Sequence, residues 1–349
     1  MFFGSYNNNQ ANKKGIYVYQ LDTVSGKLSK VTSIKVGNPS YLTLGNGGVV
    51  YACINTKTPN QGSVSAYKFN SANKSLTFIN KQGSCGENPV YTAVDVTGKW
   101  LINGNYTGGS IALHPLLSDG SIGDIAQQYK FTDSSVDTLR QTASHIHSTV
   151  FSPKGDYLFA PDLGADKIRI YSFDAQYQHP LQPTDPPYTK TVLGSGPRHF
   201  TFHPNGKFAY CIEEMGGAVD AYALNNGRLD RLQRIDTHPD TLTEGFESSD
   251  IHISPDGKFL YASNRGKENN IAIFSINANG TLQSVGYQST LGLHPRIFAI
   301  DPSGKFLIAP NVNSSNVIIF KRNHVTGLLT QIGKETKIEH VSCVQIGKY

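Results

Sequence analysis

Several side chains in this sequence are of types that bind anions or transfer protons. They are the histidines His145 and His147, the arginines Arg198 and Arg296, which each follow a proline, the acidic pair Glu213–Glu214, and Arg265. Histidine and carboxylate groups exchange protons near neutral pH, and arginine presents several N–H donors to an anion. These residues are far apart in sequence, so any shared chemistry depends on a fold that gathers them.

The composition limits the class of protein and its partners. The chain has 349 residues, of which 38% are hydrophobic, which is enough for a sizeable core and excludes a disordered chain. The formal net charge is only +5, with Lys and Arg scattered, which argues against nucleic acid as a partner. The longest apolar runs are strand-sized, such as VIIF at 317–320, so we expect no membrane segment.

The start of the chain bears on its location. It begins MFFGSY, without a basic segment followed by a long apolar one, so no export signal is visible and we expect a cytoplasmic protein. A leader removed before this start would leave the same sequence, so export remains the alternative.

Metal and cofactor sites lack a recognisable signature. The cysteines Cys53, Cys85, Cys211 and Cys343 are widely separated with no CxxC, which favours single buried thiols over disulfides or a zinc site. His145 and His147 could ligate a metal from one face of an extended segment, but no third ligand has a recognisable spacing. We therefore interpret His147 as a polar residue that lines a channel of the fold and not as a metal ligand, and we expect neither metal nor cofactor.

An internal repeat organises the chain. Six segments share a turn glycine followed by an apolar run that ends in small or polar residues, as in GKFAYCIE (206–213) and GKFLYASN (257–264). The glycines of successive repeats are 47 to 57 residues apart. An apolar strand precedes each turn and two further strands follow, so each repeat predicts a four-stranded antiparallel sheet of the kind that forms a propeller blade.

The two ends of the chain complete the repeat count. Seven third strands accompany only six complete pairs of first and second strands. The missing pair is supplied by FFGSY (2–6), a lone second strand, and VSCVQI (341–346), a lone first strand. We therefore predict an all-β protein, a single seven-bladed β-propeller over residues 1–349, closed by pairing of the terminal strands. A β-helix or a sandwich would leave this complementarity unexplained.

Propeller geometry gathers the candidate residues. First strands line the central channel, so their starts and the ends of the second strands share one rim. Strand starts on this rim are Asn38, Asn88, His147, Arg198, Asp250 and Arg296. Strand ends are Asn55, Asn105, Asp162, Glu214, Arg265 and Asn311. The longest connections, at about 130–146 and 236–249, enter the same rim, where lids are expected.

Each candidate also has a structural interpretation. Arg198 and Arg296 could mark a turn that the repeats share, and Arg265 could simply pair with Asp250. We expect Glu213 to be a solvated loop acid and Glu214 to point inward. Taken singly, each structural interpretation is at least as good as a functional one, but their convergence on one rim favours function.

Four segments resemble the lactonase family of seven-bladed propellers, which includes the propeller type of 6-phosphogluconolactonase and the fungal carboxy-cis,cis-muconate lactonising enzyme. They are HSTVFSPKGDYLFAPDLGADKIRIY (147–171), GPRHFTFHPNGKFAYCIEE (196–214), SPDGKFLYASNRG (254–266) and NGNYTGGSI (103–111). The similarity extends over essentially the whole chain.

The resemblance implies roles for four rim residues. The family's channel-strand histidine matches His147, its Pro-Arg arginine matches Arg198, its acid sixteen residues later matches Glu214, and its arginine after Ala-Ser matches Arg265. On this basis Glu214 or His147 acts as general base, while Arg198 and Arg265 bind anionic groups. Asn105, Asp250, Arg296 and Asn311 complete the predicted rim.

The resemblance further implies hydrolysis of a small anionic sugar lactone, 6-phosphoglucono-1,5-lactone, in the pentose phosphate pathway. A muconate-type cycloisomerase would use the same arginines for a dicarboxylate, and a propeller without chemistry would be a binding or scaffolding module. Family members with the same rim differ in activity, so these alternatives remain open at this point, and the sequence predicts no oligomeric state.

Overall fold

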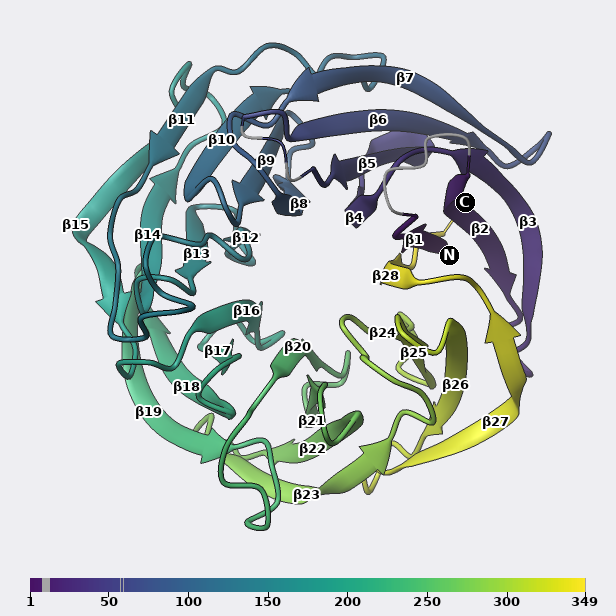
Figure 1. Cartoon of the computed structure of the whole chain (residues 1–349), viewed down its shortest axis with the longest axis vertical. Helices are drawn as coiled ribbons and strands as arrows, with labels where there is room; N and C mark the ends of the chain where they lie inside the picture. Colours follow the sequence, from purple (N-terminus) through teal and green to yellow (C-terminus); the bar gives the residue numbers. More distant parts are fainter. Residues whose placement is uncertain (8–12, 57, 59, 349) are drawn as a thin grey trace.

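The computed structural model describes residues 1–7, 13–56, 58 and 60–348 of the chain. In this part of the chain, seven four-stranded antiparallel sheets stand around a central axis like the blades of a propeller (Figure 1). Helical structure there is limited to one 3-10 turn, Asn46–Gly48, and no helix is long and apolar enough to cross a membrane. The predicted seven-bladed propeller is therefore confirmed.

Six blades are continuous in sequence, and their strands run from the channel outward in chain order (Figure 1). The first three blades contain β4 (Pro39–Leu44), β5 (Val49–Ile54), β6 (Ser63–Asn70) and β7 (Ser75–Gly83); β8 (Pro89–Val94), β9 (Trp100–Asn105), β10 (Ser110–Pro115) and β11 (Gln127–Lys130); and β12 (Val150–Phe151), β13 (Tyr157–Asp162), β14 (Lys167–Phe173) and β15 (Leu181–Lys190). The next three contain β16 (Pro197–Phe202), β17 (Phe208–Glu213), β18 (Ala218–Asn225) and β19 (Arg228–Asp236); β20 (Ser248–Ile253), β21 (Phe259–Asn264), β22 (Asn270–Ile276) and β23 (Leu282–Ser289); and β24 (Ala299–Ile300), β25 (Phe306–Asn311), β26 (Asn316–Arg322) and β27 (Leu329–Lys337).

The seventh blade joins the two ends of the chain. It contains β28 (Val341–Gln345), β1 (Phe2–Ser5), β2 (Lys14–Leu21) and β3 (Leu28–Lys35), from the channel outward. β1 pairs antiparallel with β28, with Phe3 opposite Val344 and Gly4 opposite Cys343. The ring is closed in the predicted way, which leaves no unpaired sheet edge between the first and last blades.

Packing between blades buries both faces of the middle strands. All six residues of β21 are buried, because neighbouring blades cover each side of this sheet. In one such interface Phe159, Phe200 and Tyr222 belong to a single apolar cluster, with the rings of Phe159 and Phe200 stacked at 5.3 Å. The apolar runs that revealed the repeat are therefore the core between blades.

Cysteines take no part in cross-linking the blades. All four thiols are free, and Cys53, Cys211 and Cys343 are buried as predicted. Cys85 is exposed, which contradicts the prediction of a buried thiol at this position.

Serine side chains link successive blades next to the channel. The hydroxyl of Ser148 donates to the Arg198 carbonyl at 2.9 Å, and that of Ser249 donates to the Arg296 carbonyl at 2.6 Å. Ser342 and Ser40 make the same kind of bond to Pro39 and Pro89. These bonds fix the backbone of Arg198 and Arg296 relative to the preceding blade.

Candidate functional site

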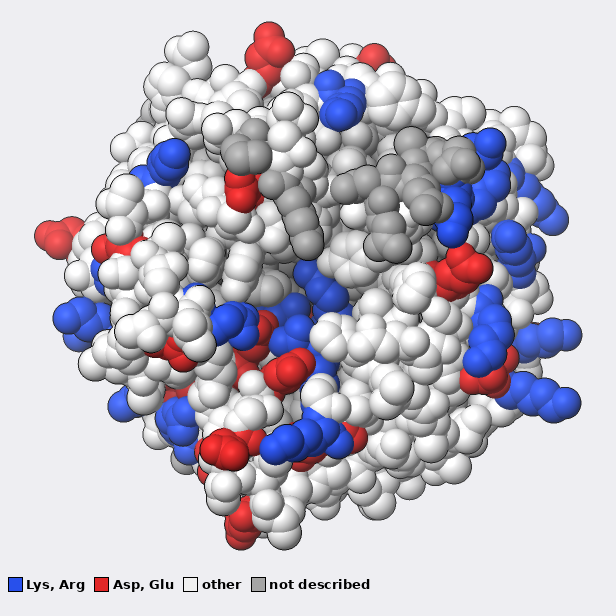
Figure 2. All heavy atoms as spheres, in the orientation of Figure 1, with Lys and Arg blue, Asp and Glu red and all other residues white. Residues whose placement is uncertain are grey.

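The rim of the channel holds a cluster of charged side chains. Figure 2 shows Lys and Arg side chains, with acidic ones beside them, in the hollow at the centre of this face. The four residues singled out by the family resemblance meet there: Arg198 in β16, Glu214 directly after β17, Arg265 directly after β21 and His147 before β12. We call this hollow the funnel.

Glu214 is the centre of the cluster. Arg198 Nε donates to Glu214 Oε2 at 2.8 Å, and Arg265 Nη2 lies 3.0 Å from the same oxygen. Arg140 Nη2 donates to Oε1 at 2.7 Å. Burial alone would raise the pKa of Glu214, but the positive charges of Arg265, Arg198 and Arg140 outweigh it and lower the pKa to about 2. Glu214 is therefore ionised and a weak base.

Arg140 was missed by the sequence analysis, although its loop was not. It belongs to the long connection at 130–146 that was expected to form a lid, and it also donates to the Tyr106 hydroxyl at 3.3 Å. The backbone N–H of Arg140 donates to Asp137 Oδ1, which fixes the turn that carries it. A lone arginine in a predicted lid was the available signal.

His147 is a neutral imidazole beside Glu214. It is 5% exposed, and its Nε2 lies 4.0 Å from Glu214 Oε2. Burial, followed by the charge of Arg198, lowers its pKa well below the usual value. Its Nδ1 is buried and has no hydrogen-bond partner among the described residues. The funnel thus contains an uncharged proton acceptor in a strongly positive surrounding.

The floor of the funnel is formed by His199 and Asp250. Asp250 was a predicted rim residue, whereas His199 was not predicted. Their side chains are joined by a 2.7 Å hydrogen bond between His199 Nδ1 and Asp250 Oδ1. The His199 and His147 rings lie 5.3 Å apart. The predicted alternative that Arg265 pairs with Asp250 is wrong, because Arg265 pairs with Glu214.

His199 escaped prediction because of a β-bulge. Neighbouring residues of a regular strand point to opposite faces, so alternation alone would not bring Arg198 and His199 to the same site. The β16–β17 register shifts between Pro197 and His199, which brings both side chains into contact with funnel residues. The same shift follows the proline that begins the first strand of two other blades, Pro39 and Pro89, so this repeated proline was the available signal for the bulge.

Arg296 differs from the other funnel arginines because it forms no ion pair with any described residue. Its Nη1 donates to the carbonyls of Ser40 at 3.1 Å and Ser342 at 3.3 Å. The nearby His294 has a pKa lowered to about 4 by burial and by the charges of Arg265, Arg296 and Arg198. The side chain of Arg296 therefore brings a positive charge that no carboxylate of the described residues pairs with.

The side chains of two predicted rim residues bind backbone carbonyls of neighbouring connections. Asn105 Nδ2 donates to the Ser84 carbonyl at 2.8 Å, and Asn311 Nδ2 donates to the Thr290 carbonyl at 3.1 Å. Both are the last residues of their strands, as is Glu213 of β17. Because side chains alternate, it is the following residue, as with Glu214 and Arg265, that faces the funnel.

Glu213 is not the solvated loop acid that the sequence suggested. It is fully buried, and it accepts a 2.9 Å hydrogen bond from Arg234 Nε on β19, the outermost strand of the same blade. The prediction failed because Glu213, the last residue of β17, is buried in an ion pair with Arg234, a contact that the repeat pattern does not reveal.

His145 has a structural partner. Its Nδ1 lies 2.8 Å from the Tyr106 carbonyl, and its ring stacks on that of Tyr106 at 4.3 Å. No group of three metal-ligating side chains is found among the described residues.

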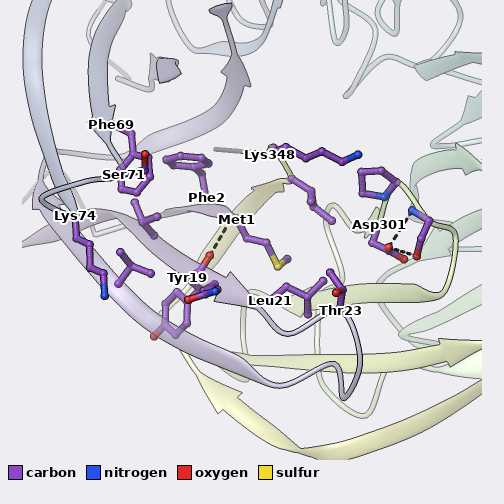
Figure 3. Close-up of a pocket in the computed structure, with 17 residues that line it drawn as sticks. Met1, Phe2, Tyr19, Leu21, Thr23, Phe69, Ser71, Lys74, Asp301 and Lys348 are labelled. Carbon is purple, nitrogen blue, oxygen red and sulfur yellow. Dashed lines mark hydrogen bonds between the residues drawn. The ribbon is translucent and has the colours of Figure 1, made fainter. Parts of the chain in front are cut away.

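A cavity of about 760 Å³, shown in Figure 3, is lined by residues other than those of the funnel. Met1, Tyr19 and Leu21 line it together with Asp301, which lies in the hairpin turn at the opposite end of the blades. The Met1 amino group donates to the Tyr19 carbonyl at 2.7 Å. None of the funnel residues lines this cavity, so its size alone does not make it the site of chemistry.

Comparisons with known proteins agree with the fold and extend over the whole ring. Residues 1–346 match the family described as "Lactonase, 7-bladed beta-propeller". The chain is 43% identical to a 6-phosphogluconolactonase of Formosa agariphila over 308 residues, 86% of each chain. It is 32% identical to that of Bacillus subtilis, covering 85% of this chain and 83% of the relative.

The fold is also similar to that of solved structures over nearly the whole chain. A Bacteroides fragilis protein superposes with a TM-score of 0.91 at 38% identity, covering 98% of this chain and 96% of the other. A periplasmic gluconolactonase of Pseudomonas aeruginosa also has a TM-score of 0.91, at 33% identity, covering 97% and 96% of the two chains.

Proposed function

The chain belongs to the lactonase family of seven-bladed β-propellers, and we propose from this and from its funnel that it hydrolyses 6-phosphoglucono-1,5-lactone to 6-phosphogluconate. The observation that carries the proposal is the neutral His147 beside a carboxylate that is fixed by three arginines. This reaction would place the enzyme in the pentose phosphate pathway.

Lactone hydrolysis requires a base and a site for negative charge. The oxygen of water attacks the carbonyl carbon while one of its O–H bonds breaks, and the carbonyl oxygen becomes negative. The ring C–O bond then breaks, and the ring oxygen leaves as a hydroxyl group after taking a proton. The site must therefore accept one proton, stabilise an oxyanion and return a proton.

His147 is the better base of the two predicted candidates. Glu214 has a pKa of about 2 and both of its oxygens accept bonds from arginine, so it gains little from taking a proton. His147 is uncharged and its Nδ1 has no partner among the described residues. A bound anion would offset the charge of Arg198, which lowers the pKa of His147, and so would make the imidazole more basic. In this role Glu214 orients the arginines and His147.

Arg198 and Arg265 suit the developing oxyanion. Each guanidinium has five N–H donors, and each arginine spends some of them on Glu214 and on backbone carbonyls of Ser249 and Glu247. The ion pairs with Glu214 hold the guanidinium groups in place before substrate arrives, so little reorganisation is needed during the reaction.

Arg296 suits the phosphate group of the substrate. Among the described residues it has no carboxylate partner, and His294 beside it has a lowered pKa and stays neutral. The relatives include both 6-phosphogluconolactonases and a gluconolactonase. An unneutralised arginine favours the phosphorylated substrate, because a phosphate can form charge-assisted hydrogen bonds to it.

The test is a rate measurement with purified protein and freshly prepared 6-phosphogluconolactone, followed by acid release against a blank for spontaneous opening. We expect a rate well above the blank, a loss of at least about 100-fold in His147→Ala, and no change in His324→Gln, an exposed histidine outside the funnel. An undiminished rate in His147→Ala would remove the base. No activity with any lactone would favour a cycloisomerase or a binding module.

A further inference from the structure

The hydrogen bonds of Asp250 fix the chemical state of the funnel floor. Asp250 Oδ1 accepts from His199 Nδ1 at 2.7 Å. Its Oδ2 accepts from His252 Nε2 at 2.8 Å and from the Phe298 backbone N–H at 3.0 Å. Burial would raise the pKa of Asp250, but His252 and His199 hold it well below the usual value. Asp250 is thus ionised and acts only as an acceptor.

An ionised Asp250 decides which nitrogen of His199 carries the proton. The nitrogen bonded to the carboxylate must be the donor, so His199 has its proton on Nδ1. Burial, followed by the charge of Arg198, lowers the pKa of His199 to about 4, so the ring is neutral near pH 7. His199 Nε2 is therefore an acceptor, and it is buried without a partner among the described residues.

His147 is in the matching state on the other side. The nearest carboxylate oxygen, Glu214 Oε2, lies 4.0 Å from its Nε2, which favours the tautomer with the proton on Nε2. Its Nδ1 is then a second buried acceptor without a partner. The two rings are 5.3 Å apart at their centroids and tilted by 67°.

Two neighbouring buried acceptors call for a ligand that has two donors. An unfilled buried acceptor is costly, and buried polar groups of this kind are normally satisfied by protein or by ordered water. Water has two O–H donors and two lone pairs, and a bound water needs two to four polar partners. A water that donates to both imidazoles would leave its lone pairs free to attack.

We propose that a water molecule held between His147 Nδ1 and His199 Nε2 is the nucleophile, with His199 as its second acceptor and Asp250 as the positioning residue of His199. This rests on the proposed lactone hydrolysis. As the water oxygen bonds to the carbonyl carbon, one proton passes to His147, while the bond to His199 keeps the oxygen in line. His147 then returns the proton to the leaving ring oxygen, so protons balance over the cycle.

The packing around His199 supports a fixed orientation. The Tyr91 ring meets the His199 ring edge-on at 5.4 Å and stacks on Tyr41 at 4.1 Å. His199, Asp250 and His252 line a cavity of about 260 Å³, and Tyr41 and Tyr91 line the same cavity. The charged groups that act on His199 are Arg198, Arg296 and Asp250, with His147 as the neighbouring titratable ring. The ring is therefore held by Asp250 on one side and by aromatic rings on another.

Variants of His199 and Asp250 test the proposal. We expect His199→Phe, which removes the acceptor, to lower kcat about 100-fold with KM within about threefold. His199→Gln keeps an acceptor oxygen and is expected to recover at least about tenfold of that loss. Asp250→Asn should move the acid limb of the kcat/KM profile, which reports the protein without substrate, from near pH 4 to lower pH, because the carboxylate is what raises the pKa of His199.

Equal losses in His199→Phe and His199→Gln would overturn the proposal, because a purely structural role does not require an acceptor. A crystal structure of the unmodified protein gives a test that is independent of folding in the variants. We expect a water within about 3.2 Å of both nitrogens, and its absence would also overturn the proposal. Inactivity of the unmodified protein with every lactone would instead refute the proposed function, whether or not the water is seen.

Discussion

Glu213 and Glu214 are consecutive acids with opposite properties. Both are buried, with 0% and 5% of their surfaces exposed. Glu214 faces the funnel and has a pKa of about 2. Glu213 lies beside Asp220 and Arg234 within its blade and has a pKa of about 7. Burial is shared, so the difference comes from the neighbouring charges. Among the described residues, three arginines form ion pairs with Glu214, whereas Glu213 pairs with Arg234 alone.

A second carboxylate explains the high pKa of Glu213. Burial is the largest cause and Asp220 is the next, outweighing the attraction of Arg234. Glu213 Oε1 and Asp220 Oδ1 are both buried without a hydrogen-bond partner among the described residues. Like charges that cannot both be solvated retain a proton between them. One strand end therefore places an ionised carboxylate in the charged cluster of the funnel and a carboxyl group with a raised pKa beside Asp220.

The strongest test of this comparison exchanges each acid for its amide. In Glu214→Gln the arginines lose their shared anion, and we expect kcat/KM for 6-phosphogluconolactone to fall about 100- to 1000-fold. Glu213→Gln changes the pair of Glu213 and Asp220 and leaves Glu214 unchanged. We therefore expect its kcat/KM to be within about threefold of that of the unmodified enzyme. Steady-state acid release at pH 7 measures both. Equal losses would mean that the two acids share one structural role.

The next test concerns arginines with and without a carboxylate partner. Arg296 has none among the described residues, so we expect Arg296→Gln to lower kcat/KM for 6-phosphogluconolactone roughly 10- to 100-fold. The loss with neutral gluconolactone should be much smaller, because that substrate lacks the phosphate. The ratio of the two kcat/KM values is the readout.

Arg234→Gln is the control for Arg296, because Arg234 already pairs with Glu213 outside the funnel. It should leave the substrate ratio unchanged. A similar loss with both lactones in Arg296→Gln would show that Arg296 only links Ser40 and Ser342 across the closing blade.

Much of this arrangement is readable from the sequence, and the parts that are not have definable causes. Repeat spacing and strand polarity placed His147, Arg198, Glu214 and Arg265 on one rim, because a closed ring of identical units fixes where each strand begins and ends. Because side chains alternate along a strand, the sequence also predicts that Glu213 and Glu214 point in opposite directions.

The failures come from features that the alternation of side chains along a strand does not predict. The bulge before His199 changed which face the residue occupies. Arg140 lies in a loop that has no strand register, so no periodic pattern predicts that its side chain contacts Glu214. Asn105 and Asn311 were assigned to the rim one residue too early, since a strand end is defined by pairing and not by residue type.

The third test uses pH to separate the acids by stability. The pKa of Glu213 is about 7 when folded and 4.5 when exposed, so the folded state binds more protons between these values. The stabilisation that comes from the protonated Glu213 is fully present below about pH 4.5 and is lost as pH rises through 7. The resulting decrease in the free energy of unfolding is at most about a few kcal/mol. Glu214 has the opposite sign, with stability present above pH 4.5 and lost as pH falls toward 2.

Urea unfolding of the unmodified protein and of Glu213→Gln at pH 5 and pH 8 measures the difference. We expect the unmodified protein to lose stability relative to the variant between these two values, a window in which Glu214 stays ionised in both. A difference that does not change with pH would show that Glu213 is ionised throughout.

The smallest effect is expected at Arg140, the outermost of the three arginines around Glu214. Its side chain is 46% exposed, whereas that of Arg198 is 1% exposed. An exposed ion pair contributes at most about 1 kcal/mol, so Arg140→Gln should leave the unfolding free energy nearly unchanged and lower kcat/KM by less than about tenfold. Arg228→Gln, an exposed arginine paired with Asp230, is the matched control and should change neither. If Arg140→Gln is as damaging as Glu214→Gln, then this exposed arginine, and not the buried pair with Arg198, is what makes Glu214 differ from Glu213.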